Sequence, residues 1–225
     1  MKILAIDTTT PDGSIAVLDD ERLLAEIGVA SATTHSSRLL GSVQHLLAAL
    51  GLDIRDIDAF AVSPGPGSFT GLRIGLSTVK AFAFASGKPV APVSSLEALA
   101  RKLWDDGPGL VAPVLDAKKG EIYAALFEIG SRRPVEVVSQ GAYAPDSFVS
   151  LLPRRKVRFI GNGLALCRDA VVRKLKAKAF FPARTTFIAA EVGRLGLGLL
   201  AAGKGMPAER LEPLYFRKSQ AEDKR

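Results

Sequence analysis

Both halves of the chain carry one local pattern, in which an apolar strand ends in aspartate and is followed by a polar turn, a glycine and a second strand. In the first half, the first strand ends at Asp7 and the second covers residues 14–18. In the second half, the first strand ends at Asp116 and the second covers residues 121–127. Such a turn can cradle a phosphate, because its amides point inward and the carboxylate can hold a metal-bound water. The repeat therefore predicts two similar lobes that could flank a nucleotide.

A duplicated plan of this kind is that of the actin, Hsp70 and sugar-kinase class, an α/β fold of two ribonuclease H-like lobes. We expect an N-terminal lobe over residues 1–104, with the C-terminal segment as a candidate for completing it. After a break rich in Gly, Asp and Pro, we expect a C-terminal lobe over residues 110–215 and a flexible tail at 216–225. One aspartate after one strand is usually only a turn residue. Whether the two aspartates bind nucleotide or preserve the fold therefore stays open.

Hydrophobic periodicity gives the order of the elements. Short apolar or alternating runs indicate strands, and apolar residues at a spacing of 3.6 indicate helices. The predicted strands cover residues 2–7, 14–18, 22–29, 59–63, 89–93, 113–116, 121–127, 135–139, 157–160 and 177–180. The predicted helices cover residues 39–50, 70–85, 96–104, 164–175 and 185–202. Each lobe is thus expected to open with a three-strand meander and to continue with alternating helices and strands.

Size and composition favour a compact protein. The chain has 225 residues, of which 48% are hydrophobic, so it can bury a sizeable core. No apolar run approaches the roughly 18 uncharged residues that a membrane-spanning helix needs, and the N-terminal residues lead into a strand pattern rather than a secretory signal. We therefore expect a cytoplasmic protein with no membrane contact. Cys167, the single cysteine, is expected to be a small core residue.

The formal net charge of the chain is +7. Excess basic charge raises the local concentration of phosphates, so an anionic partner such as RNA or a nucleotide is a candidate. The alternative is that the basic clusters are solvated helix faces or edge strands, and no aromatic residues that could stack on bases are interleaved with them. The clusters comprise Arg154, Arg155, Lys156 and Arg158, then Arg168, Arg173, Lys174, Lys176 and Lys178, and the terminal Lys218, Lys224 and Arg225.

Residues 63–75 place four glycines and two prolines between a predicted strand and a predicted helix. Prolines limit φ, and glycines permit positive φ and close approach, so this loop could present bare amides to an anion at a helix start. Tight packing of the strand against the helix would require the same glycines. The loop is not a Walker loop, because no Gly-Lys-Ser/Thr follows, and it does not match the dinucleotide fingerprint. Both interpretations stay open.

Several short motifs occur together in this chain, and the block at 63–75 is the most specific of them. They are Ile6, Asp7, Thr8 and Thr9 at the first turn, His35 and Ser36, residues 63–75, residues 116–123, and Pro213, Tyr215 and Arg217 near the end. With these motifs the sequence resembles, over its whole length, the bacterial TsaB family, also called YeaZ, which is paralogous to the tRNA-modifying enzyme TsaD. Lys118 stands where the family often has Arg, and Phe216 where it often has Leu. These departures do not disturb the assignment.

The resemblance implies a subunit needed to transfer a threonylcarbamoyl group to the adenosine next to the anticodon, in tRNAs that read codons beginning with A. Members of the family do not catalyse this step. They act in a complex with the catalytic paralogue TsaD and the ATPase TsaE, they meet tRNA through that complex, and they form a homodimer when alone. The resemblance implies no cofactor of the chain's own, with ATP as a candidate ligand at the partner interface.

The histidines test for a catalytic role, because the catalytic paralogue holds a metal through a His-x-x-x-His pair. Here His35 and His45 are ten residues apart, which on one helix separates them by about 15 Å. They cannot share one ion, so no metal is expected. No Gly-x-Ser-x-Gly motif marks a serine nucleophile either. We therefore expect a protein that is not an enzyme; the alternatives are a weak ATPase or kinase of the actin-like class that uses Asp7 and Asp116, and a self-standing RNA-binding module.

The candidate site residues form two sets. The nucleotide-type set, functional or vestigial, comprises Asp7, Thr8, Thr9, Gly65, Gly67, Asp116, Gly161 and Gly163. The interface set follows from the family, whose first-lobe helices pack on the paralogue or on a second copy; it comprises His35, Leu39, Val43, Leu46, Arg73, Leu76, Lys80 and Phe82. A leucine stripe at helical spacing is also typical of a helix face that packs on its own core. The second of these helices is apolar around much of its circumference, as a helix buried by a partner is.

Overall fold

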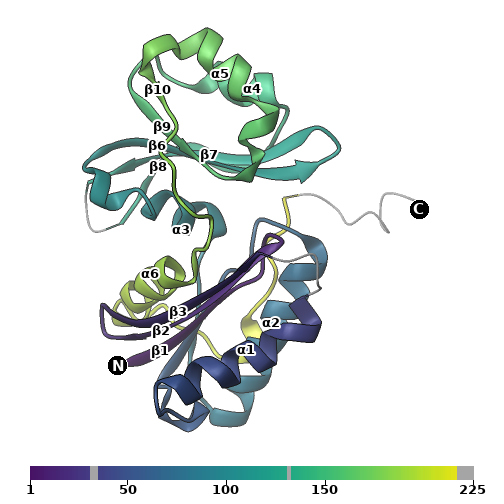
Figure 1. Ribbon diagram of the computed structural model, residues 1–225, viewed down its shortest axis with the longest axis vertical. Coiled ribbons are helices and arrows are strands. Elements are labelled where there is room, and N and C mark those ends of the chain that lie inside the picture. Colours follow the sequence, from purple (N-terminus) through teal and green to yellow (C-terminus); the bar gives the residue numbers. More distant parts are fainter. Residues whose placement is uncertain (31–34, 131–132, 217–225) are drawn as a thin grey trace. The chain divides into compact units, whose positions relative to one another are not determined.

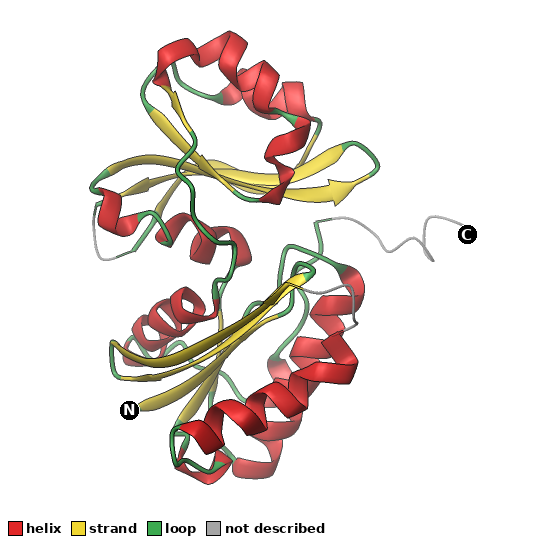
Figure 2. Ribbon diagram, in the orientation of Figure 1, coloured by secondary structure: helices red, strands yellow, loops and turns green. Residues whose placement is uncertain are grey.

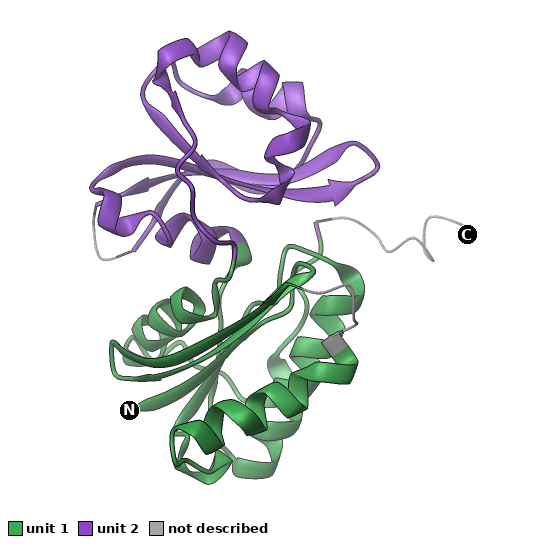
Figure 3. Cartoon of the chain, viewed as in Figure 1, with its two compact units in different colours: residues 1–95, 187–215 green, residues 96–186, 216–225 purple. Residues whose placement is uncertain are grey.

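The computed structural model describes residues 1–30, 35–130 and 133–216, with only the backbone of His35. The chain forms two compact units (Figure 3). The first contains residues 1–95 and 187–215, and the second contains residues 96–186 together with 216. The boundaries differ from those of the expected lobes, because residues 96–104 cluster with the second unit, whereas the C-terminal residues 187–215 cluster with the first unit, which the C-terminal segment was a candidate to complete.

The first unit is built on a five-stranded mixed sheet. Its strands have the order β3-β2-β1-β4-β5, with β1 antiparallel to β2 and parallel to β4. The hairpin between β1 and β2 and the parallel crossovers after them are the pattern that the sequence predicts. The strands are β1 (Lys2–Asp7), β2 (Asp12–Asp19), β3 (Arg22–Ala30), β4 (Ala59–Val62) and β5 (Val90–Pro92).

Helices cover both faces of this sheet (Figures 1 and 2). Because side chains alternate along a strand, Leu4 and Ile6 of β1 pack in one cluster with α1 (His35–Ala49) and α2 (Phe69–Ser86). The opposite face meets α6 (Ala189–Ala201), which reaches the first unit from the far end of the sequence. The 3₁₀ helices η1 (Ile54–Asp56) and η5 (Ala208–Arg210) complete the unit.

The second unit repeats the topology of the first. Its sheet has the order β8-β7-β6-β9-β10, again with an antiparallel meander and then parallel strands. The strands are β6 (Gly109–Lys118), β7 (Glu121–Ile129), β8 (Val135–Tyr143), β9 (Val157–Ile160) and β10 (Ala179–Phe180). The identical order confirms the duplication read from the two strand-Asp-turn patterns, and with it the two-lobed α/β fold class.

The helices of the second unit are shorter than those of the first. They are α3 (Ser95–Arg101), α4 (Pro145–Leu151) and α5 (Arg168–Leu175), with 3₁₀ turns η2 (Trp104–Asp106), η3 (Asn162–Leu166) and η4 (Lys176–Lys178). In Figure 1, α4 and α5 lie on one face of the sheet and α3 on the other. Cys167 is buried in the core with α4 and α5, as expected, and burial raises the pKa of its thiol to about 11.

Several boundaries differ from the sequence prediction. The helix α4 was not predicted, because its seven residues complete barely two turns and open on Pro145, which also signals a loop. The helix expected over 164–175 is divided, with η3 ending before α5 begins. The last predicted strand shrinks to two residues, Ala179 and Phe180. Within the described residues, no helix is long and apolar enough to cross a membrane.

Candidate functional site

Asp7 ends β1 and is fully buried. Its Oδ1 accepts hydrogen bonds from the backbone N–H of Thr9 (3.2 Å) and from Thr9 Oγ1 (2.7 Å). Its Oδ2 is buried and has no hydrogen-bond partner among the described residues. Loss of solvation raises the pKa of Asp7 to about 6; the hydrogen bonds from Thr9 oppose this shift, and the charge of Glu26 adds to it. The carboxyl group is therefore part of a sealed turn.

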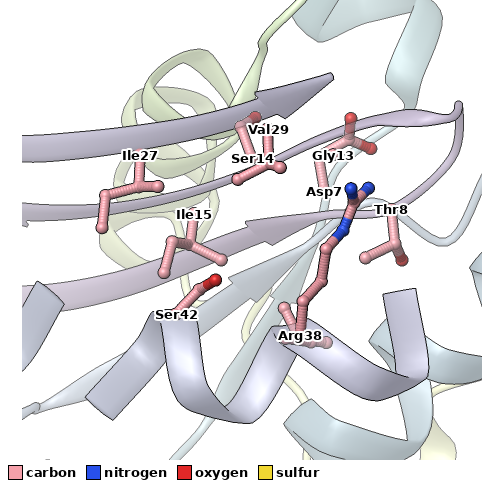
Figure 4. Close-up of a pocket in the computed structure, with 10 residues that line it drawn as sticks. Asp7, Thr8, Gly13, Ser14, Ile15, Ile27, Val29, Arg38 and Ser42 are labelled. Atoms are coloured by element: carbon pink, nitrogen blue, oxygen red, sulfur yellow. The ribbon is translucent and has the colours of Figure 1, made fainter. Parts of the chain in front are cut away.

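A small cavity lies beside Asp7, between the β2–β3 ribbon and the start of α1 (Figure 4). Its volume of about 20 Å³ has room for a single water molecule, so it cannot hold a nucleotide. In Figure 4 the Arg38 side chain rises from α1 toward the ends of the strands, and its Nη2 donates to the carbonyl of Pro11 (3.0 Å). The cavity is lined by Asp7, Thr8, Gly13, Ser14, Ile15, Ile27, Val29, Arg38, Leu39 and Ser42.

The raised pKa of Asp7 predicts a pH dependence of stability. The folded protein holds this proton more tightly than the unfolded chain does, so the stabilisation is complete below about pH 3.8 and is lost as pH rises through about 6. Asn cannot ionise but keeps the acceptor for Thr9. We expect Asp7→Asn to gain about 2 kcal/mol in unfolding free energy relative to the unsubstituted chain between pH 4 and pH 7. Urea unfolding at both pH values measures this difference, and parallel profiles for the two proteins would contradict it.

The glycine-rich loop packs against this first turn. A Cβ built on Gly67 would lie 2.3 Å from the carbonyl oxygen of Thr9. On Gly71 it would lie 2.0 Å from the carbonyl oxygen of Thr8, and on Gly75 it would lie 2.3 Å from Thr8 Oγ1. All three distances are far below van der Waals contact, so a side chain at these positions would push the loop and the start of α2 away from β1.

Hydrogen bonds tie the same loop to two other segments, the first turn and the start of α3. Ser68 N–H donates to the Thr9 carbonyl (2.7 Å), and Thr8 Oγ1 donates to the Gly71 carbonyl (2.8 Å). The hydroxyl of Ser95 donates to the Pro66 carbonyl (2.6 Å). These contacts favour tight packing over an anion cradle as the reason for the glycines.

Gly65 lies in the same loop but does not join the first turn. Its φ of +133° is one that side chains rarely adopt, and a Cβ there would lie 2.6 Å from the carbonyl oxygen of Leu214. The N–H of Leu214 donates to the Pro64 carbonyl (2.8 Å). The position is therefore glycine because the C-terminal segment runs directly across the loop.

Asp116 repeats the turn of Asp7 in the second unit. Its Oδ1 accepts from the backbone N–H of Lys118 (2.7 Å), two residues on, as Asp7 accepts from Thr9. Its Oδ2 pairs with Lys118 Nζ (2.8 Å), and this hydrogen bond holds the pKa of Asp116 below its ordinary value. The side chain of Asp116 is 28% exposed, unlike that of Asp7. The amino group of Lys118 thus pairs with the carboxylate oxygen to which the water of a hydrated cation would otherwise bind.

Gly161 and Gly163 also pack against the strand that carries this aspartate. A Cβ on Gly161 would lie 2.1 Å from the Val114 carbonyl oxygen, and one on Gly163 would lie 2.6 Å from the carbonyl carbon of Leu115. Between them, Asn162 Oδ1 accepts from the backbone N–H of Asp116 (3.0 Å). The structure therefore brings Gly161, Gly163 and Asp116 together, as it brings Gly67 to Thr9 in the first unit.

These two turns do not fit a catalytic metal–nucleotide centre. Such a centre needs carboxylate oxygens that can reach the waters of a bound cation. Asp7 is sealed in its turn, and Asp116 is neutralised by Lys118. The described residues also contain no cluster of three His, Cys, Asp or Glu side chains that could hold a metal ion. The turns are suited to fixing the strand ends in place.

The interface set needs correction. Leu39, Val43, Leu46 and Leu76 are each 5% exposed or less and belong to the core of the first unit, so a partner cannot touch them. Phe82 is half-buried and stacks on Phe60 with ring centroids 5.9 Å apart. The helical stripe predicted as an interface is the stripe by which α1 and α2 bind their own sheet.

The remaining members of the set lie nearer the surface. Lys80 is half-buried, and Arg73 is exposed with its guanidinium 3.8 Å from the ring centroid of Phe69. That ring in turn stacks on Tyr215, 5.1 Å away. His45 is exposed on α1, as expected, and the side chain of His35 lies outside the described residues. Arg217 of the family motif lies outside them as well.

Other exposed residues of these helices escaped the sequence analysis. Leu40 on α1 is 59% exposed and Phe84 on α2 is 75% exposed. On a helical projection Phe84 lies about 140° from the centre of the buried stripe of α2, so a projection would have separated it from the core positions. Leu40 lies only about 75° from the centre of the stripe of α1, beside Leu47, and a projection would not have separated it. A large apolar residue at such a position indicates a contact outside the chain.

Comparison with known structures gives the class. Component A of (R)-2-hydroxyglutaryl-CoA dehydratase from Acidaminococcus fermentans has the same fold, with a TM-score of 0.54 at 10% identity over 89% of this chain and 99% of that one. A Pseudomonas aeruginosa structure described as similar to the peptidase YeaZ aligns with a TM-score of 0.84 at 28% identity, over 96% of this chain and 99% of that one. The protein thus has the duplicated, two-lobed α/β fold of these structures.

The sequence comparisons give the family. The model of the family described as TsaD, tRNA N6-adenosine threonylcarbamoyltransferase, matches residues 28–222. The Bacillus subtilis tRNA threonylcarbamoyladenosine biosynthesis protein TsaB is 31% identical over 230 aligned residues, which cover all of this chain and 97% of that protein. The chain belongs to the TsaB (YeaZ) family, which falls within this TsaD-like group.

Proposed function

We propose that this chain is a non-catalytic subunit for threonylcarbamoyl transfer to the adenosine next to the anticodon, in tRNAs that read codons beginning with A. It acts in a complex with a TsaD-like catalytic paralogue and a TsaE-like ATPase. The names of its relatives in tRNA threonylcarbamoyladenosine biosynthesis support the pathway. The lack of fit between its two aspartate turns and a catalytic metal–nucleotide centre supports the non-catalytic role.

The assembly role is supported mainly by the composition of the outer face of α1 and α2. The two helices total 33 residues without a single Asp or Glu, and their outer face carries the basic residues Arg73 and Lys80. On this face Leu40 and Phe84 are largely exposed. An apolar surface with only basic charge fits a partner surface that is apolar and acidic. We place the contact with the TsaD-like paralogue there.

The same face also predicts the state of the chain when the paralogue is absent. An exposed aromatic such as Phe84 is costly to leave in water, so a second copy of the chain covers it when the paralogue is absent, which gives a homodimer.

The chain needs no cofactor of its own, and ATP is held at the interface between partners. Transfer RNA then meets the chain as part of the complex.

The test is reconstitution of the transfer reaction. The paralogue, the ATPase and an unmodified tRNA transcript are incubated with and without this chain, and the modified adenosine is measured by mass spectrometry. We expect formation of the modified base to depend on the chain, and the isolated chain to turn over no ATP. Transfer that is indifferent to the chain, with ATP hydrolysis by the chain alone, would instead support the ATPase or kinase alternative.

A further inference from the structure

The second unit contains a cavity that neither aspartate turn uses. It has a volume of about 230 Å³ and opens where η2 leads into β6, beside the start of β9. Three of its seven lining residues are basic and one is acidic. The lining residues are Asp106, Pro108, Gly109, Leu110, Arg155, Lys156 and Arg158. We call it the basic pocket.

The basic pocket has a surplus of positive charge. Arg158 is only 7% exposed, and its guanidinium donates to the carbonyls of Gly107 (2.6 Å) and Leu103 (3.4 Å), which carry no charge. The carboxylate of Asp106 also interacts with the charge of Arg158. Asp106, the one acidic lining residue, pairs with Arg184 (2.6 Å). Arg155 and Lys156 are exposed at the rim. An anionic group that enters the pocket therefore meets several basic side chains, while the one acidic lining residue, Asp106, is already paired with Arg184.

The charge around the basic pocket is concentrated in one stretch of sequence. Residues 147–186 contain ten Lys or Arg and one acidic residue, whereas the rest of the chain contains 20 basic and 22 acidic residues. The positive charge of the protein thus belongs entirely to this part of the second unit. Arg154 and Lys178 continue the basic surface beyond the pocket, and Lys178 Nζ donates to the Arg154 carbonyl (2.8 Å). An extended basic surface suits a polyanion better than a small ion.

An aromatic ring adjoins the basic pocket. Phe180 of β10 is 39% exposed and is the strand partner of Arg158 in β9. Lys156 Nζ lies 4.4 Å from the centre of its ring. Sequence spacing hides this arrangement, because β9 and β10 are separated by α5. A half-exposed ring beside basic groups is how proteins stack an unpaired base while they hold its phosphate.

We propose that the basic pocket binds the phosphate backbone of tRNA, with Arg155 and Lys156 as the phosphate contacts, and that Phe180 stacks on an unpaired base. The pocket is smaller than the roughly 300 Å³ at which small-ligand sites begin, so it suits one phosphodiester group better than a whole nucleotide. The inference rests on the proposed function, since it gives the chain a direct part in presenting tRNA to the catalytic paralogue. It adds a site in the second unit, whereas α1 and α2 belong to the first.

Binding of the full-length chain to a fluorescent, unmodified tRNA transcript tests this proposal. The variant carries Arg155→Gln and Lys156→Gln, and the matched control carries Arg22→Gln and Lys204→Gln, which remove the same charge from exposed positions of the first unit. We expect the pocket variant to bind roughly tenfold more weakly for each lost charge at 0.1 M salt. Its slope of log affinity against log salt should fall by about two. The control variant should keep most of the tRNA affinity and most of its salt dependence.

A second measurement separates this inference from the proposed function. In the reconstituted transfer reaction, the pocket variant should raise the KM for tRNA and leave the binding of the paralogue unchanged. Equal tRNA affinity for pocket variant and control would overturn the inference, as would an unchanged KM, even if transfer still depends on the chain. Loss of ATP binding in the pocket variant, with tRNA binding retained, would overturn it too, because the pocket would then be a site for a free nucleotide.

Discussion

Replacement of Gly71 by alanine is expected to remove about 3 kcal/mol of unfolding free energy. The new Cβ would lie 2.0 Å from the carbonyl oxygen of Thr8, and both groups belong to backbone that cannot rotate away. Overpacking of this kind typically costs about 1–3 kcal/mol, and the loss of the fit between β1 and α2 places Gly71→Ala at the upper end. In a chain of this size such a loss lowers Tm by roughly 6–12 °C. Urea unfolding followed by circular dichroism measures it.

Gly41→Ala is the matched control. Gly41 also lies within a helix, but it is exposed and no atom lies within 4 Å of a Cβ built on it. Alanine favours a helix interior over glycine by about 1 kcal/mol, so this variant should be neutral or more stable. The same substitution thus has opposite signs on α1 and α2. A stability for Gly71→Ala within 0.5 kcal/mol of that of Gly41→Ala would contradict the packing role of the loop, a threshold of about the size of ordinary surface effects.

The fold class could be predicted from the sequence because the duplication shows in a short local pattern that occurs in both halves of the chain. A strand that ends in Asp, a turn and a second strand constrain the backbone over a few residues, and both copies do form antiparallel hairpins with the same turn at Asp7 and Asp116. The sequence offered the C-terminal segment only as a candidate for completing the first lobe, because local signals do not decide which sheet that segment covers. Whether α6 packs on one sheet or the other depends on contacts far apart in sequence, such as that of Gly193 with Leu18.

The candidate site was harder to predict than the fold. Glycines at 67, 71 and 75 are compatible with an anion cradle and with close packing, and only the distances to Thr8 and Thr9 separate the two. The interface set was wrong for Leu39 and its neighbours because amphipathic periodicity reports burial without saying what covers the residue. The aromatic ring beside the basic pocket was missed because Phe180 meets Lys156 only through the sheet.

A charged residue at Phe84 is expected to weaken the complex strongly while leaving the fold intact. Phe84 is 75% exposed, so Phe84→Glu should change the unfolding free energy by no more than about 0.5 kcal/mol. Buried aromatic anchors at protein interfaces are worth about 2 kcal/mol or more, so the affinity for the TsaD-like paralogue should fall at least about 30-fold. Leu40→Glu on the neighbouring helix should act in the same direction. Calorimetric titration of the paralogue measures both.

Leu151→Glu controls for the loss of an exposed apolar side chain. Leu151 is 52% exposed on α4, in the second unit, so the substitution should leave the affinity for the paralogue and the transfer reaction unchanged. Phe84→Glu should also convert the isolated chain to a monomer, because the same face covers the second copy. If Phe84→Glu and Leu151→Glu bind the paralogue equally well, the contact does not lie on α1 and α2. The absence of acidic residues from these helices would then need another cause.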